Sequence, residues 1–269
     1  MEEHIGEDHA MVKYAPGNAG DILKHSWLIE TVTWLLKECE SPFLYADSFC
    51  GCCKYQGVQP AIRARLEISL RDSDLYRYQE DHLKKFCYLG SASLVQKVCR
   101  THGVKCRIAV FDEEEAKIRS FPDDGDFVKL SLTDGYRILE TPEHYHLILI
   151  DPYYDPVPMP EKLLPHLISG KRDSSKLVFI IHRAGDPSLY NTFVAKLKDV
   201  LRREEQRALM GRIPSHPYFE FDAKFHTEML LVPAHSLQDK ARRDLFPRLR
   251  GITLEQNRII ASETYMSEF

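Results

Sequence analysis

The sequence predicts an α/β fold in which a mainly parallel sheet is covered by helices on both faces. Two observations carry this prediction: apolar, strand-like runs recur along the chain as far as residue 182, and helical patterns lie between them. A third observation is the change of pattern in the last third of the chain. There the strand-like runs 218–225 and 227–234 follow each other with almost no connection, which indicates an antiparallel pair at one edge of the sheet.

Five runs are expected to form the parallel strands, because each is short, apolar and followed by polar or turn-forming residues. They span residues 42–47, 106–112, 127–134, 146–151 and 176–182. Four of them end in an aspartate, namely Asp47, Asp112, Asp134 and Asp151. Since ligands of such sheets bind outside the carboxyl ends of the strands, we expect these four acids to lie where a ligand binds.

Helices are expected at residues 21–40, 91–102, 113–121, 161–169 and 190–206. A single domain is expected to span residues 1–269. Between the first turn and residue 91, basic residues alternate with aromatic ones, and four of them are candidate phosphate ligands or, alternatively, part of a solvated helix face: Arg63, Arg65, Lys84 and Lys85. Residues 240–251 form a second basic stretch with the same two interpretations.

Composition excludes several classes of protein. A chain of 269 residues with 43% hydrophobic and 28% charged residues is expected to bury a sizeable core and not to be disordered. No apolar run approaches the roughly 20 residues of a membrane span, and the acidic first residues do not resemble a secretory signal, so we expect a cytoplasmic protein. The formal net charge of −4 argues against a broad phosphate-binding surface, although a local basic patch stays compatible with nucleic acid.

The seven cysteines are expected to be reduced thiols, because their number is odd and their spacing suggests no disulfide framework. Cys50, Cys52 and Cys53 raise the question of zinc. Structural zinc needs four ligands, and no matching second pair is present, so no metal site is predicted. Small thiols that line a tight turn are the preferred interpretation.

A mainly parallel sheet closed by a late hairpin is the shape expected of S-adenosylmethionine-dependent methyltransferases. In that fold the turn after the first strand, with Asp47 and Gly51, is the place for the methionine end of the cofactor, since small residues allow close approach. Asp112 is either a carboxylate for the ribose hydroxyls or a helix cap for residue 113 onward. Asp134 and Gly135 form either a turn and cap or part of the cofactor site. The first turn lacks G-x-G-x-x-G, which disfavours a nicotinamide oxidoreductase.

The stretch LILIDPYYDP (residues 147–156) combines a strand with the chemistry that adenine methylation requires. The N6 amine of adenine is a poor nucleophile, so an enzyme must hold it with acceptors, and Asp151 with the carbonyl of Pro152 supplies two. Tyr154 supplies a ring for stacking on a flipped base. The alternative is a buried strand that ends in a proline turn, with Tyr153 and Tyr154 as packing residues.

Several motifs resemble those of the bacterial 23S ribosomal RNA adenine-N6 methyltransferase J family. KYAPGNAGDILKH (residues 13–25) resembles its amino-terminal signature, and PFLYADSFCGCCKYQ, YLGSASLVQKVCR, DGYRIL and LILIDPYY resemble its later motifs in the same order. The resemblance covers residues 13–154. It implies a Rossmann-like methyltransferase fold with a small helical insertion at residues 57–88. It also implies S-adenosylmethionine as cofactor, and an adenine of ribosomal RNA, or of another nucleic acid, as substrate.

The resemblance also implies roles for single residues. Lys24 and His25 match a pair whose histidine contacts the cofactor, although His25 also fits the apolar face of its helix as a core residue. Ser91 matches a cofactor-contacting serine, and Asp112 falls at the acidic ribose-binding position. The last matches are Asp134 and Gly135, beside the adenine of the cofactor, and Asp151, the catalytic aspartate.

Two motifs depart from the family pattern. The turn His-Ala-Gly-Ala-Gly has become Phe49-Cys-Gly-Cys-Cys53, which loses a histidine and one of two glycines. If the second glycine position needs a positive φ, Cys53 costs on the order of 1 kcal/mol there. Asp-Pro-Pro-Tyr has become Asp-Pro-Tyr-Tyr, which loosens the corner at Tyr153. A catalytically weakened or inactive methyltransferase fold that binds nucleic acid or acts as a scaffold is therefore the alternative function.

Overall fold

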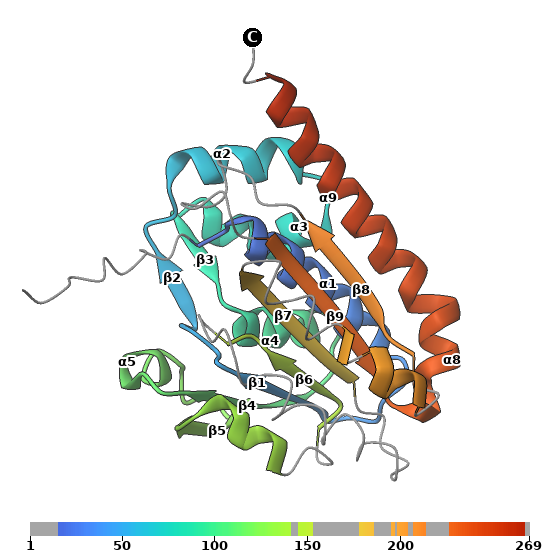
Figure 1. Cartoon of the computed structure of the whole chain (residues 1–269). Coiled ribbons are helices and arrows are strands. Elements are labelled where there is room, and N and C mark those ends of the chain that lie inside the picture. Colours follow the sequence, from blue (N-terminus) through green and yellow to red (C-terminus); the bar gives the residue numbers. More distant parts are fainter. Residues whose placement is uncertain are drawn as a thin grey trace, which may run out of the picture.

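The computed structural model of the protein describes residues 16–140, 145–152, 178–185, 195–196, 198–203, 207–213 and 226–266. Within these residues seven strands form one sheet in the order β5-β4-β1-β6-β7-β9-β8 (Figure 1). Five of them run parallel: β1 (Phe43–Ser48), β4 (Cys106–Asp112), β5 (Phe127–Leu132), β6 (Leu147–Ile150) and β7 (Val178–Gly185). The arrangement confirms the Rossmann-like fold that the sequence predicts.

The hairpin at the sheet edge differs in part from the expectation. β9 (His226–Pro233) is antiparallel to β7 on one side and to β8 (Leu209–Ile213) on the other. The strand expected at 218–225 lies outside the described residues, and the partner that β9 has on this side is 209–213. This short run follows directly on a helical pattern and contains a glycine, so the sequence gives it no clear strand signal.

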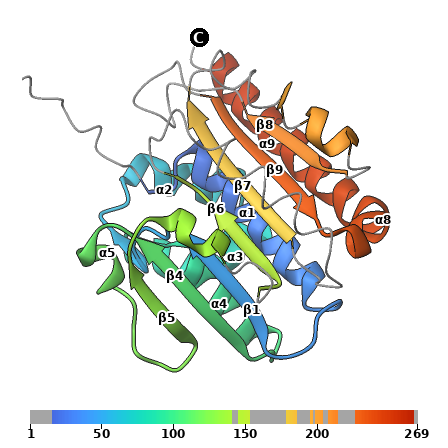
Figure 2. The same ribbon diagram turned by 60° about the horizontal axis from the view of Figure 1, so that its bottom comes forward.

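Helices cover both faces of the sheet (Figures 1 and 2). On one face lie α1 (Ala19–Leu35), α4 (Ser91–Thr101) and α9 (Phe246–Met266), and on the other lie the 3-10 helix η1 (Gly135–Glu140) and the helical residues 198–203. β6 is buried throughout: Leu147 and Leu149 pack toward α1 and α4, whereas Ile148 and Ile150 pack toward η1. Burial on both faces explains why its sequence is continuously apolar.

The sheet order places β1 between β4 and β6, so the chain moves outward in opposite directions from this strand. In open α/β sheets a crevice forms at the carboxyl ends of the strands where the direction of winding reverses. The register aligns Ser48 with Phe111 of β4 and with Ile150 of β6, so the residues that follow these three strands meet at one edge of the sheet.

A second, two-stranded sheet lies next to the insertion. β2 (Lys54–Gln56) pairs antiparallel with β3 (Cys87–Leu89), and α2 (Pro60–Ser69) and α3 (Asp74–Leu83) lie between them in the sequence. Ser73 caps α3, because its hydroxyl accepts the N–H of Tyr76 at 3.1 Å. The buried amide of Gln79 exchanges two hydrogen bonds with the backbone of Leu89, which fixes α3 against β3.

The remaining elements are short. α5 (Glu115–Ile118) follows β4, and η3 (His235–Leu237), α8 (Gln238–Lys240) and the π-helical η4 (Ala241–Leu245) lead into α9. The helix expected at 161–169 lies outside the described residues, and of the one expected at 190–206 only 195–196 and 198–203 are described. In the described part of the chain, no helix combines the length and the apolar character needed to span a membrane.

A glycine of β8 allows α1 and α9 to meet over the end of the sheet. A Cβ atom at Gly211 would lie 2.5 Å from the ring of Trp27 and 2.9 Å from the hydroxyl of Thr253, whereas one at Gly251 in α9 would meet nothing within 4 Å. We expect Gly211→Ala to lower the free energy of unfolding by about 1–3 kcal/mol through overpacking. Gly251→Ala, the control, should raise it by up to ~1 kcal/mol. Urea denaturation measures both, and equal effects of the two variants would contradict this packing.

Candidate functional site

A cleft of about 620 Å³ lies at the carboxyl ends of β1, β4 and β6. It is lined by residues from the start of α1, the turn after β1, the start of α4 and the segments after β4, β5 and β6. Nine of the sequence-predicted site residues lie along it: Lys24, His25, Gly51, Ser91, Asp112, Asp134, Asp151 and Pro152 on its wall, with Asp47 directly behind. Tyr154 lies outside the described residues, and Gly135 is buried beneath the ring of Phe49.

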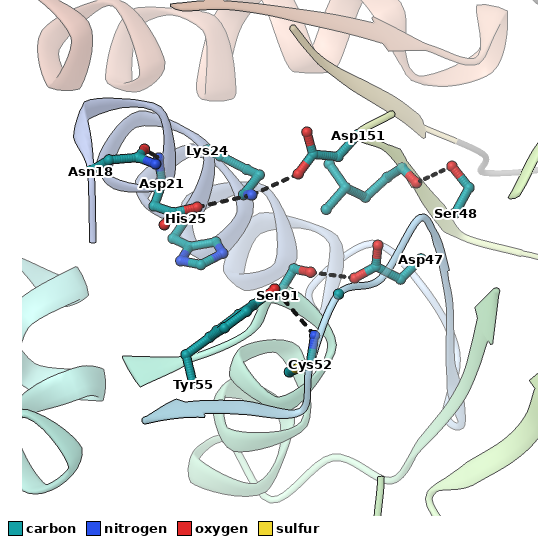
Figure 3. A network of polar contacts seen from close by, with 12 residues as sticks. Asn18, Asp21, Lys24, His25, Asp47, Ser48, Cys52, Tyr55, Ser91 and Asp151 are labelled. Atoms are coloured by element: carbon teal, nitrogen blue, oxygen red, sulfur yellow. Dashed lines mark hydrogen bonds and ion pairs between the residues drawn. The ribbon is translucent and has the colours of Figure 1, made fainter. Parts of the chain in front are cut away.

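An ion pair joins the two walls of the cleft (Figure 3). The ammonium of Lys24 donates a hydrogen bond of 2.6 Å to Oδ2 of Asp151 and lies 3.1 Å from Oδ1 of Asp21. Asp21 is held in turn by the backbone N–H of Gly17, which donates to its Oδ2 at 2.9 Å. Asn18 caps α1 by accepting the N–H of Asp21 at 2.9 Å. The start of α1 is thereby fixed to the end of β6.

Lys24 remains positively charged although its side chain is buried. Burial, the largest influence, lowers the pKa of Lys24, but the carboxylates of Asp151 and Asp21 together raise it well above its ordinary value. This ammonium holds the carboxylate of Asp151 at the wall of the cleft, where a carboxylate accepts hydrogen bonds from a ligand.

Asp47 is fully buried behind Ser91. The hydroxyls of Ser91 and Tyr45 both donate to its Oδ2, the second at 3.0 Å, and its Oδ1 has no hydrogen-bond partner among the described residues. Burial raises the pKa of Asp47 to about 7, against the hydrogen bonds from Ser91 and Tyr45, which lower it. The hydroxyl of Ser91 donates its hydrogen bond to Asp47. The lone pairs of the Ser91 oxygen therefore face the cleft and can accept a hydrogen bond from a cationic ligand.

The turn after β1 differs from the expectation in where it is strained. Gly51 has φ +61°, but the non-glycine residue with positive φ is Phe49, at +74°, and Cys53 is not in the left-handed region. The condition for a conformational free-energy cost at Cys53, a positive φ, is therefore not met. A similar conformational cost falls on Phe49 instead. The carbonyl of Phe111 accepts the N–H groups of both Phe49 and Cys50, at 2.8 and 3.0 Å, and holds this conformation.

The ring of Phe49 lines the cleft and meets the edge of Tyr136, with ring centres 5.0 Å apart and planes at 76°. A Cβ atom at Gly135 would lie 2.9 Å from this ring and from the backbone nitrogen of Phe49. Gly135 is therefore matched to the ring of Phe49, and its packing against the turn after β1 explains the glycine at this position.

Asp112 and Asp134 both line the cleft and accept hydrogen bonds from the backbone around it. Oδ1 of Asp112 accepts the N–H of Glu114 at 3.0 Å, and Oδ2 accepts the N–H of Gly51 at 3.2 Å from across the cleft. The expected helix cap at Asp112 is not formed, because α5 begins only at Glu115 and has no side-chain cap. Oδ1 of Asp134 accepts the N–H of Tyr136 at 2.9 Å and starts η1, as the turn-and-cap interpretation requires, and a ligand contact of either acid stays a prediction.

His25 is buried, as its position on the apolar face of α1 indicates, and it also lines the cleft. Its ring stacks on Tyr88 with centres 5.4 Å apart, and its Nδ1 is 3.1 Å from the hydroxyl of Tyr88. The burial of His25 fits the core interpretation, and its place on the cleft wall is compatible with the ligand interpretation.

Sequence reasoning missed several residues of the cleft wall. Several of them stand inside the quoted motifs, but the motifs assigned none of them a ligand role. They come from the turn after β1, from β2, and from the segments after β3, β4 and β5: Phe49, Cys50, Tyr55, Gly90, Glu113, Glu114, Lys117 and Tyr136. The hydroxyl of Tyr55 accepts the N–H of Cys52 at 3.1 Å. The same hydroxyl would lie 2.0 Å from a Cβ atom at Gly51, so position 51 has room for glycine alone. Tyr55 could have been found from the sequence by its position shortly after this turn.

The wall of the cleft is acidic. Five acids and two lysines line it: Asp112, Glu113, Glu114, Asp134, Asp151, Lys24 and Lys117. An excess of carboxylates at the cleft favours a cationic ligand and disfavours phosphate groups inside it. In the described residues, no three His, Cys, Asp or Glu side chains gather in a way that could hold a metal ion.

The basic residues of the insertion are partly neutralised by their neighbours. The guanidinium of Arg63 pairs with Glu67 at 2.8 Å and lies 4.9 Å from the ring centre of Phe86, and Lys84 pairs with Glu80 at 3.0 Å. Such pairs compete with phosphate binding, which favours the solvated-face interpretation for these two residues.

Comparison with known proteins shows the fold. No family model and no curated protein sequence matches the chain. Protein LPL1258 from Legionella pneumophila superimposes with a TM-score of 0.62 at 14% identity, over 90% of this chain and 94% of that one.

Two further structures give lower scores. A SAM-dependent methyltransferase from Archaeoglobus fulgidus has 11% identity, with 78% and 94% of the two chains covered and a TM-score of 0.39. TYW2 from M. jannaschii, in complex with AdoMet, has 8% identity, with 83% and 78% covered and a TM-score of 0.42.

The buried carboxyl of Asp47 gives a prediction on pH dependence. Its pKa in the folded protein, about 7, lies above the value near 4 of an unfolded chain, so the folded state binds the extra proton. The contribution of Asp47 to stability is therefore present below about pH 4 and is lost as the pH rises to about 7. Asp47→Asn should become progressively more stable than wild type across this range, as measured by urea denaturation. The control, exposed Asp123→Asn, should follow the wild-type profile, and parallel profiles for all three proteins would contradict the assignment.

Proposed function

We propose that the protein is an S-adenosylmethionine-dependent methyltransferase that acts on the N6 amine of a flipped adenine in ribosomal RNA. The observation that carries the proposal is the corner formed by Asp151 and Pro152 at the end of β6. It lies in the same cleft as the strand-end acids Asp112 and Asp134, and the buried ammonium of Lys24 orients it. The motif resemblance over residues 13–154 supports the choice of substrate.

The residues of the cleft fit the proposed cofactor. Its sulfonium and amino groups are cationic, and the cleft has an excess of carboxylates. Asp112, at the end of β4, is the acceptor for ribose hydroxyls. The oxygen of Ser91, whose hydroxyl donates to Asp47 behind it, is suited to the amino group. Gly90 precedes α4 as its N-cap residue and has no side chain to cap the helix, so the first N–H groups of α4 are suited to a carboxylate.

The chemistry assigned to the chain is orientation and proton transfer. When bound, S-adenosylmethionine supplies a methyl group, and its displacement leaves the electron pair of the broken C–S bond on a neutral sulfur. The carboxylate of Asp151 and the carbonyl of Pro152 accept the two N–H groups of the amine and direct its lone pair along the line of attack. As the N–C bond forms, the amine proton becomes acidic and passes to Asp151.

The acidic wall also limits how a nucleic acid can bind. Phosphates are repelled from the cleft itself, so the proposal requires that a single base enters while the backbone stays outside. The weakened or inactive scaffold is the second candidate, and the observation that favours it is the altered turn with its strained Phe49.

The test is Asp151→Asn, which keeps the size of the side chain and removes the negative charge. We expect it to lower the rate of methyl transfer to an unmodified large-subunit ribosomal RNA transcript by at least about a hundredfold, because a neutral amide cannot take up the amine proton and is a weaker acceptor than a carboxylate. Cofactor affinity should stay within about threefold of wild type. Mass spectrometry of N6-methyladenosine measures the product, and calorimetric titration measures the affinity.

Asp123→Asn, an exposed aspartate away from the cleft, is the matched control and should retain wild-type activity. Full activity of Asp151→Asn would contradict the catalytic assignment. A wild-type protein that binds the cofactor and RNA but methylates no adenine-containing substrate would instead support the inactive scaffold.

A further inference from the structure

The outer strand β5 exposes an apolar row that the proposed function does not use. Val128, Leu130 and Leu132 are 47%, 42% and 54% exposed, although aliphatic residues of strands are usually buried. They alternate along one strand, and Leu130 lies beside the buried Val110 of β4, on the sheet face that carries α4. The row therefore extends the apolar layer on this face of the sheet to the edge of the sheet.

The backbone of β5 is also open for pairing. No strand in the described residues pairs with its outer edge. Consecutive residues of a strand direct their N–H and C=O groups alternately to the two sides, and the N–H of Thr133 donates to the carbonyl of Asp112 on β4 at 2.9 Å. Leu132 and Leu130 therefore direct their backbone groups to the outside.

Two features that usually prevent an edge strand from pairing with another chain have little effect on β5. A lysine on an edge opposes pairing by its charge, but the ammonium of Lys129 lies over the ring of Phe111, 4.8 Å from its centre. A bulge twists an edge away, but here the irregularity falls between Ile108 and Ala109 at the start of the strand pair. It leaves 129–132 regular.

The pattern of β5 is complementary to itself. In an antiparallel pairing of two copies centred on Leu130, Val128 lies opposite Leu132, Leu130 opposite Leu130, and Lys129 opposite Ser131. Apolar side chains then meet apolar ones, and no lysine faces a lysine. Beyond the strand ends Asp126 approaches Asp134 of the other copy, and the guanidinium of Arg100, 2.7 Å from Asp126, offsets this repulsion.

We propose that β5 pairs with β5 of a second copy of this chain, so that the two sheets join across a twofold axis. A twofold pairing satisfies the outward backbone groups of both copies and buries both apolar rows at once. The second copy is the occupant that the self-complementary order of side chains favours.

The test is sedimentation equilibrium of the full chain, from about 1 to about 100 μM. We expect a monomer–dimer equilibrium in wild type, and a dissociation constant raised at least about tenfold by Leu130→Lys, which places lysine opposite lysine. The control is Leu254→Lys on α9, where the side chain is 69% exposed, and it should leave the constant unchanged.

Circular dichroism establishes that each variant is folded. A wild type that stays monomeric at every concentration would overturn the proposal. So would a dimer that survives Leu130→Lys or that is weakened equally by Leu254→Lys. Because neither Leu130 nor Leu254 lies in the cleft, the result of this test does not depend on whether the protein transfers methyl groups.

Discussion

The buried ion pair of Lys24 and Asp151 is the interaction on which the candidate site depends. It joins residues 127 positions apart in the sequence, at the start of α1 and the end of β6. A buried ammonium needs a carboxylate partner, and removing one member of such a pair typically costs about 3–5 kcal/mol. The position of Asp151 is thus set by the fold of the amino-terminal helix as well as by its own strand.

Close contacts around the first turn explain how the chain accommodates its unusual residues. A Cβ atom at Gly90 would lie 2.1 Å from the carbonyl oxygen of Cys52, so the turn is packed directly against the start of α4. Gly51 and Gly135 are similarly confined by Tyr55 and Phe49. The strain is then concentrated at Phe49, where the carbonyl of Phe111 holds the backbone. The cysteine at position 53 therefore does not by itself distort the turn.

The sequence predicts the parallel part of the fold well, because its strands are buried on both faces and their hydrophobic runs are unambiguous. β4 is predicted to the residue, and the others begin or end within three residues of the expected bounds. The late strand β8 is missed, since five residues with an internal glycine carry no alternating pattern. The strand-end aspartates predict the edge of the sheet where the cleft lies, but not that Asp47 turns away from it. That orientation depends on the hydroxyl of Tyr45, two residues earlier in β1, and on that of Ser91, which folding brings near from 44 positions away.

Binding of S-adenosylmethionine in the acidic cleft is best tested by calorimetric titration of the purified wild-type protein. S-adenosylmethionine and S-adenosylhomocysteine are titrated in parallel into protein that circular dichroism shows to be folded. We expect micromolar binding of both, since the turn at Phe49 leaves the cleft open and its acids in place. The absence of detectable binding at millimolar ligand would contradict it.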